Sequence, residues 1–141
     1  MIGVVVVTHG QLATELVNAA ETIVGDLPQF LAVSIGWHED VQDAREAIAT
    51  AIDKVRQPGG VLLMTDMFGG TPSNLGITFL EKDKIEIVTG VNLPMLIKAA
   101  SIKDGASLTD TARALREHGR NAIWVTSDLL SGDPGQGSGP A

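Results

Sequence analysis

The stretch Gly3-Val4-Val5-Val6-Val7-Thr8-His9-Gly10 decides the fold of this chain of 141 residues. Four successive valines, with no alternating polar residues, are typical of a strand buried on both faces, as in a parallel sheet covered by helices. His9 stands directly at the end of this strand. Because ligands of open α/β sheets bind beyond the carboxyl ends of the strands, the sequence predicts that His9 faces whatever the protein handles.

Outward from this stretch, the chain alternates strands with helices. Apolar runs predict further strands at 30–35, 61–65, 85–89 and 122–126, and helical spacing predicts helices at 11–24, 40–55, 75–80, 96–102 and 107–119. This alternation predicts an α/β fold of parallel units with right-handed crossovers. In a flavodoxin-like arrangement, the four parallel strands would lie in the order 2-1-3-4.

The end of the chain differs in composition from the rest. Residues 131–141 are mostly Gly, Pro, Ser, Asp and Gln, which bury too little apolar surface to become ordered. We therefore expect one domain over residues 1–130, followed by a flexible tail over 131–141.

Composition excludes several classes of function. The chain has no cysteine, which rules out disulfides, thiolate metal sites and cysteine nucleophiles. Its net charge of −7 argues against nucleic-acid binding, which needs a basic surface. No charged leader with an apolar segment opens the chain, and no apolar run reaches the roughly 20 residues of a membrane span. We expect a cytoplasmic protein.

Two polar residues are predicted to meet at one edge of the sheet. Asp66 ends the strand at 61–65 as His9 ends the first strand, and these two strands are neighbours in the predicted order. A carboxylate beside an imidazole selects one tautomer, orients the ring and favours charge on it. His9 would then present its other nitrogen as a nucleophile.

The segment 68–74, Phe-Gly-Gly-Thr-Pro-Ser-Asn, predicts an anion site at the same edge. Its glycines allow close approach of the backbone, and Thr71 is predicted as the N-cap of a helix. Free amides at such a helix start, with Gly70, Thr71 and Ser73 nearby, can hold a phosphate. Gln11 begins a second helix beside His9, so we expect it to border the same phosphate. Together these features indicate a phosphoryl-accepting histidine, with no metal or cofactor required.

At these residues the chain resembles the IIA proteins of the mannose family of the bacterial sugar phosphotransferase system. The resemblance covers Thr8-His9-Gly10, the segment 65–74, the segment 90–95 and nearly all of residues 1–126. It implies that His9 receives phosphate on Nε2 from the carrier protein HPr and passes it to a IIB protein or domain, with membrane components involved only indirectly. It also implies that Asp66 holds the other ring nitrogen, and that Thr71 and Ser73 border the phosphate.

The resemblance further implies a homodimer in which a last, antiparallel strand, here 122–126, is exchanged between subunits. A regulatory role in an incomplete system would use the same histidine chemistry. Two alternatives remain open: the phosphohistidine subunit of a dihydroxyacetone kinase system, and a flavodoxin-like module that binds FMN or a nucleotide. The second would be expected to show aromatic planes or a glycine-rich dinucleotide motif, and the chain has no Tyr and no such motif.

The other histidines have simpler predicted roles. His38 is expected in a loop on the same side of the sheet as His9, and His118 in the last turn of a helix, where a cation suits the helix dipole. No two histidines have the spacing of metal ligands.

Overall fold

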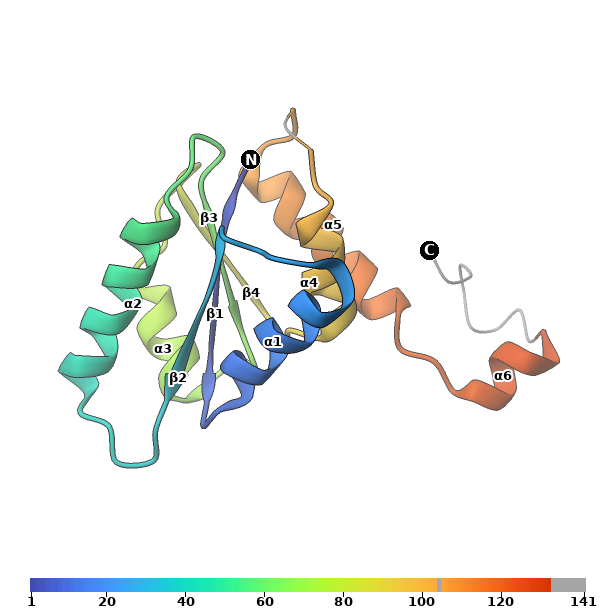
Figure 1. The fold of residues 1–141 in the computed structure, drawn as a ribbon, viewed down its shortest axis with the longest axis horizontal. Helices are drawn as coiled ribbons and strands as arrows, with labels where there is room; N and C mark the ends of the chain where they lie inside the picture. Colours follow the sequence, from blue (N-terminus) through green and yellow to red (C-terminus); the bar gives the residue numbers. More distant parts are fainter. Residues whose placement is uncertain (104, 133–141) are drawn as a thin grey trace.

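A computed structural model describes residues 1–103 and 105–132. Its core is a four-stranded sheet in which every pairing is parallel (Figure 1). The strands, in the spatial order β2-β1-β3-β4, are β2 (Phe30–Ile35), β1 (Gly3–His9), β3 (Val61–Thr65) and β4 (Ile85–Thr89). The predicted fold class and strand order are confirmed.

Helices cover both faces of this sheet (Figure 1). One face is covered by α1 (Leu12–Val24), α4 (Leu93–Ala100) and α5 (Leu108–Asn121), and the other by α2 (Val41–Val55) and α3 (Gly70–Ile77). Among the described ranges, no helix is long and apolar enough to cross a bilayer.

The four valines of β1 have no exposed surface and divide between the two layers. Val4 and Val6 pack with α1, α4 and α5, whereas Val5 and Val7 pack with α2 and α3. Burying each such side chain contributes roughly 1.5–3 kcal/mol. β1 is thereby fixed from both sides, and His9 stands at its end.

Capping residues begin three helices. The carboxylate of Asp40 accepts hydrogen bonds from the backbone N–H groups of Gln42 and Asp43, the side-chain oxygen of Asn92 accepts one from Met95, and that of Ser107 accepts one from Asp110. Such caps satisfy amides that have no partner within the helix.

Several helix boundaries differ from the prediction. The helix expected at 96–102 is α4, Leu93–Ala100. The helix expected at 75–80 begins at Gly70, with Gly69 rather than Thr71 at the N-cap position. Gly119 was expected to end a helix, but α5 continues to Asn121. A Cβ atom at Gly119 would lie 2.5 Å from Cγ of Met95, so this glycine allows α5 to pack closely on α4.

The strand predicted at 122–126 is not a strand in this chain. Ala122 caps α5, and α6 (Thr126–Ser131) begins where the strand was expected to end. Figure 1 shows α6 projecting away from the sheet, so an extended segment here has no neighbouring strand to bond. Of the predicted tail, Ser131 ends α6, and residues 133–141 lie outside the described residues.

Candidate functional site

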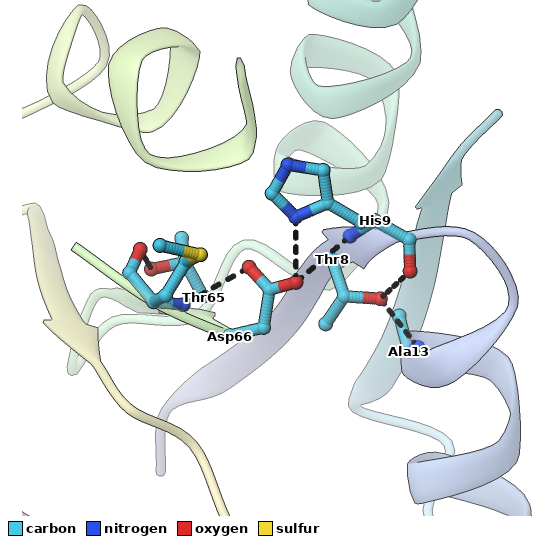
Figure 2. Close-up of polar contacts among 6 residues, drawn as sticks. Thr8, His9, Ala13, Thr65 and Asp66 are labelled. Carbon is cyan, nitrogen blue, oxygen red and sulfur yellow. Dashed lines mark hydrogen bonds and ion pairs between the residues drawn. The ribbon is translucent and has the colours of Figure 1, made fainter. Parts of the chain in front are cut away.

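His9 and Asp66 lie side by side at the carboxyl edge of the sheet, as predicted from the strand order (Figure 2). One carboxylate oxygen of Asp66, Oδ2, is 2.8 Å from Nδ1 of His9 and accepts the backbone N–H of His9 at 3.0 Å. The other, Oδ1, accepts the N–H of Met67 at 3.0 Å. The pair therefore joins the ends of β1 and β3 through both backbone and side-chain contacts.

The surroundings of Asp66 keep it ionised. Burial raises the pKa of this carboxyl, but the hydrogen bonds from the His9 ring and backbone, the charge of His9 and the N–H of Met67 outweigh burial, so the pKa lies below 3.8. An ionised carboxylate can only accept hydrogen bonds, so Nδ1 of His9 must carry the proton. In the neutral form of the ring, Nε2 then holds a free electron pair.

His9 remains accessible while its partner does not. The His9 side chain is 51% exposed and that of Asp66 is 14% exposed. In Figure 2 the second ring nitrogen points away from Asp66. The site thus offers Nε2, oriented from behind by a largely hidden carboxylate, to a reactant arriving from outside.

Thr8 ties the end of β1 to the start of α1. Its hydroxyl, which is fully buried, accepts the N–H of Ala13 at 2.6 Å and donates to the carbonyl of His9 at 3.1 Å (Figure 2). Gln11, predicted to border the phosphate, is the exposed N-cap residue of α1, with no side-chain cap bond. The start of α1 is therefore held close to His9 by Thr8 rather than by Gln11.

The start of α3 lies against the His9 ring. Gly70, the first residue of α3, has φ +80°, and a Cβ atom built on it would lie 3.0 Å from Cε1 and 3.1 Å from Nε2 of His9. Only glycine combines this backbone conformation with such a close approach. The free amides of the first turn of α3 therefore begin next to Nε2, where an anion would be stabilised.

The two predicted hydroxyl residues differ in accessibility. Thr71 is exposed in the first turn of α3. Ser73 is fully buried, and its Oγ has no hydrogen-bond partner among the described residues. Of the two, only Thr71 presents its side chain to solvent at this edge.

Sequence reasoning missed the apolar residues that surround the site. Phe68, in the loop between β3 and α3, is 77% exposed, and Leu12, in the first turn of α1, is about half exposed. The sequence could have indicated that Phe68 is exposed, since a large apolar residue in a short loop between Asp66 and two glycines has little space to pack into the core.

The remaining histidines take no part in the pair. His38 lies exposed in the loop after β2 with its ring edge-on to Trp37, and His118 is half-buried near the end of α5. Within residues 1–103 and 105–132, no three His, Asp or Glu side chains are placed to hold a metal ion.

The chain thus combines a flavodoxin-like parallel sheet with a histidine that is oriented by a carboxylate and lies beside a helix start. Residues 3–116 match the EIIA-man family model, described as the PTS (phosphotransferase system) fructose IIA component. The chain belongs to this family of phosphotransferase system components.

Individual proteins similar to this chain are also phosphotransferase system components. The chain is 29% identical to the fructose-specific EIIA component of Bacillus subtilis, over 92% of this chain and 90% of that protein. It is 30% identical to the mannose-specific EIIAB component of Escherichia coli, over 86% of this chain but only 38% of that longer protein. Among solved structures, the EIIA component of Streptococcus agalactiae superposes with a TM-score of 0.80 at 24% identity, covering 90% of this chain and 98% of that one.

A second solved structure is the mannose/sorbose-specific IIA subunit of Enterococcus faecalis. It has a TM-score of 0.76 at 25% identity and covers 87% of this chain and 92% of its own.

Proposed function

We propose that this chain is a phosphocarrier that accepts a phosphoryl group on Nε2 of His9 from phospho-HPr and passes it to a IIB histidine. The observation that carries the proposal is the hydrogen bond from Nδ1 of His9 to the ionised Asp66, made by a half-exposed ring in a chain of this family.

The transfer follows from this arrangement. The electron pair of Nε2 attacks the phosphorus atom, the new N–P bond forms, and the N–P bond of the donor histidine breaks, with its nitrogen keeping the bonding electrons. His9 then carries both the Nδ1 proton and the phosphoryl group, so its ring is cationic. The Asp66 carboxylate, 2.8 Å from Nδ1, stabilises that charge.

Backbone groups hold the phosphoryl oxygens in this proposal. The first amides of α3, at Gly70 and Thr71, would bind these oxygens, and this is supported by the close approach of Gly70 to Cε1 and Nε2 of His9. The exposed Thr71 would add its hydroxyl. Ser73 would reach the phosphate only if its buried hydroxyl reoriented, and Gln11 contributes through the start of α1. The reaction needs no metal ion bound to this chain.

The test is phosphorylation with enzyme I, HPr and phosphoenolpyruvate, followed by intact mass analysis under alkaline conditions. Wild type should gain one phosphate and His9→Ala none, whereas His38→Ala and His118→Ala should each still gain one phosphate. Phosphate on His9→Ala, or none on wild type beside a working HPr, contradicts the proposal. Transfer of the phosphoryl group from His9 to a IIB protein would support a role in sugar uptake. Transfer to dihydroxyacetone kinase subunits would support the alternative kinase system.

We also infer that the chain acts in the cytoplasm as a homodimer. β4 is an edge strand, and a groove of about 330 Å³ beside it is lined by residues of β4 and α5. The terminal arm, residues 123–132, exposes Ile123, Val125 and Leu130. Pairing of one subunit's arm with the other's β4 would cover both surfaces.

A chain ending at Ala122 should sediment as a monomer while the full chain sediments as a dimer. A full-length chain that is monomeric at micromolar concentration contradicts the exchange of the terminal arm between subunits.

A further inference from the structure

His9 has four polar atoms, and three of them are hydrogen-bonded within the chain. Its backbone N–H and its ring Nδ1 both meet Oδ2 of Asp66, at 3.0 and 2.8 Å. Its carbonyl oxygen accepts the hydroxyl of Thr8 at 3.1 Å. Within residues 1–103 and 105–132, Nε2 has no hydrogen-bond partner. The nitrogen that the proposed reaction uses is thus the one polar atom of His9 that this part of the chain leaves unbonded.

The hydroxyl of Thr8 serves as donor and acceptor at once. While it donates to the carbonyl of His9, it accepts the N–H of Ala13 at 2.6 Å (Figure 2). That amide belongs to the first turn of α1 and has no acceptor within the helix. Thr8 has no exposed surface, so solvent cannot readily replace its hydroxyl. One buried oxygen atom therefore joins the backbone of His9 to the start of α1.

A second hydroxyl supports the same helix start without touching His9. Ser34 of β2 pairs in register with Thr8 of β1. Its Oγ lies 3.4 Å from the backbone nitrogen of Thr14, which donates to it, and 2.9 Å from Oγ1 of Thr14. Thr8 and Ser34 thus each provide an acceptor for an amide in the first turn of α1. Of the two, Thr8 alone also bonds the backbone of His9.

We propose that Thr8 is a positioning residue for the phosphorylation of His9. The inference rests on the proposed function, in which Nε2 is the phosphoryl acceptor. Asp66 holds the backbone N–H of His9 and Thr8 holds its carbonyl, so the peptide groups on both sides of the His9 Cα are fixed. The bond from Nδ1 to Asp66 then limits rotation of the ring. Thr8 acts through His9 and does not touch the phosphoryl group.

Fixed placement of the backbone affects the rate because the attacking nitrogen must be aligned with the phosphorus atom. A displacement of a fraction of an ångström lowers the share of encounters that have this alignment. If Thr8 only stabilised α1, its loss would lower stability and leave the rate of the folded protein unchanged. A positioning role predicts that the rate itself falls.

The experiment measures phosphorylation of His9 with two donors, which are phospho-HPr and phosphoramidate, a small phosphoryl donor that needs no protein docking. Thr8→Val keeps the shape of the side chain and removes the hydroxyl. It should slow the reaction with phosphoramidate about tenfold, and lower kcat with phospho-HPr by the same factor at an unchanged KM. Thr8→Ser, which keeps a hydroxyl, should restore most of the wild-type rate.

Ser34→Ala is the matched control, since it removes an acceptor from the first turn of α1 and leaves the carbonyl of His9 bonded. Ser34→Ala and Thr8→Val should both lower the urea concentration at the midpoint of unfolding. Ser34→Ala should nevertheless react at the wild-type rate with both donors. If Ser34→Ala is slowed as much as Thr8→Val, support of the helix start explains the effect and the positioning role is wrong.

The other outcomes also decide. A wild-type rate in folded Thr8→Val, or no recovery in Thr8→Ser, overturns the proposal. If Thr8→Val does not fold, Thr8→Cys takes its place, because a thiol is only a weak donor and acceptor. Thr8→Cys should react more slowly with both donors, and an unchanged rate overturns the proposal. If wild type reacts with phosphoramidate but not with phospho-HPr, the proposed carrier function fails, while the phosphoramidate rates still decide whether Thr8 positions His9.

Discussion

The two loops that flank His9 differ in how they are held. In the loop after β3, Asp66 is 14% exposed and accepts three hydrogen bonds, two of them from His9. In the loop after β2, Trp37 is 92% exposed and touches only the ring of His38 among its described contacts. One loop is bound tightly to the reactive residue, and the other is displayed to solvent.

This difference separates chemistry from recognition. Groups that set the tautomer and charge of an imidazole must be placed within a fraction of an ångström, which requires burial and hydrogen bonds. Groups that recognise a partner need only be exposed at the right place. Changes at Asp66, the buried member of the loop after β3, should therefore impair every donor equally, and changes at the exposed Trp37 in the loop after β2 should impair protein donors alone.

Asp66→Asn is expected to have the largest effect. The amide cannot supply the negative charge that stabilises a cationic ring, so phosphorylation of His9 should slow about 100-fold with phosphoramidate and with phospho-HPr alike. Rates from intact mass analysis at several times check this. If the rate fell with phospho-HPr alone, Asp66 would act in docking of the donor protein. The two loops would then not differ in function.

The same substitution should change stability in a pH-dependent way. An amide nitrogen cannot accept a hydrogen bond, so one backbone N–H at His9 or Met67 loses its acceptor, at a cost of about 1–3 kcal/mol. Because the pKa of Asp66 is below 3.8 in the folded chain, its stabilisation is fully present above pH 3.8 and is lost as pH falls through the lower folded value. Urea denaturation should show that the free energy of unfolding of wild type exceeds that of Asp66→Asn at pH 7, and that this difference narrows below pH 3.8. A difference that does not change with pH would contradict the role of the ionised Asp66 in stability.

Much of this arrangement could be predicted from local chemistry. The strand ends at His9 and Asp66 and the caps at Asp40, Asn92 and Ser107 depend on neighbouring residues, so the sequence predicts them directly. The His9–Asp66 pair needed one further step, the strand order, which the alternation of strands and helices supplies.

The rest depends on contacts between distant residues. α3 begins at Gly70 rather than after Thr71, and Gly70 packs against the ring of His9, which lies 61 positions earlier in the sequence. The segment 122–126 has strand-forming residues, but a strand requires a partner edge, and residues 1–103 and 105–132 of a single chain bring none to it. The exposure of Trp37 likewise depends on the residues that surround it in space, so the pattern of the sequence does not predict it.

Gly70→Ala should have an intermediate effect. Alanine at φ +80° costs about 1–2 kcal/mol, and its Cβ would meet the ring at 3.1 Å from Nε2, which should slow phosphorylation about tenfold with both donors. The matched control is Gly36→Ala in the other loop, where a Cβ meets nothing within 4 Å. Thermal melts and the two donor assays should show loss for Gly70→Ala and none for Gly36→Ala; equal behaviour of the two variants would refute the tight packing at His9.

His38→Ala should have the smallest effect and the most selective one. Its ring packs edge-on against Trp37, an aromatic contact worth about 0.5–1.5 kcal/mol, so its removal loosens Trp37 without uncovering any buried group. The KM for phospho-HPr should rise about twofold to threefold, because Trp37 must be ordered at the moment of docking. The phosphoramidate rate should stay at the wild-type value. A change in that rate would mean that His38 affects the reactivity of His9 itself. The loop after β2 would then contribute to the phosphorylation step, which we expect to depend on the loop after β3 alone.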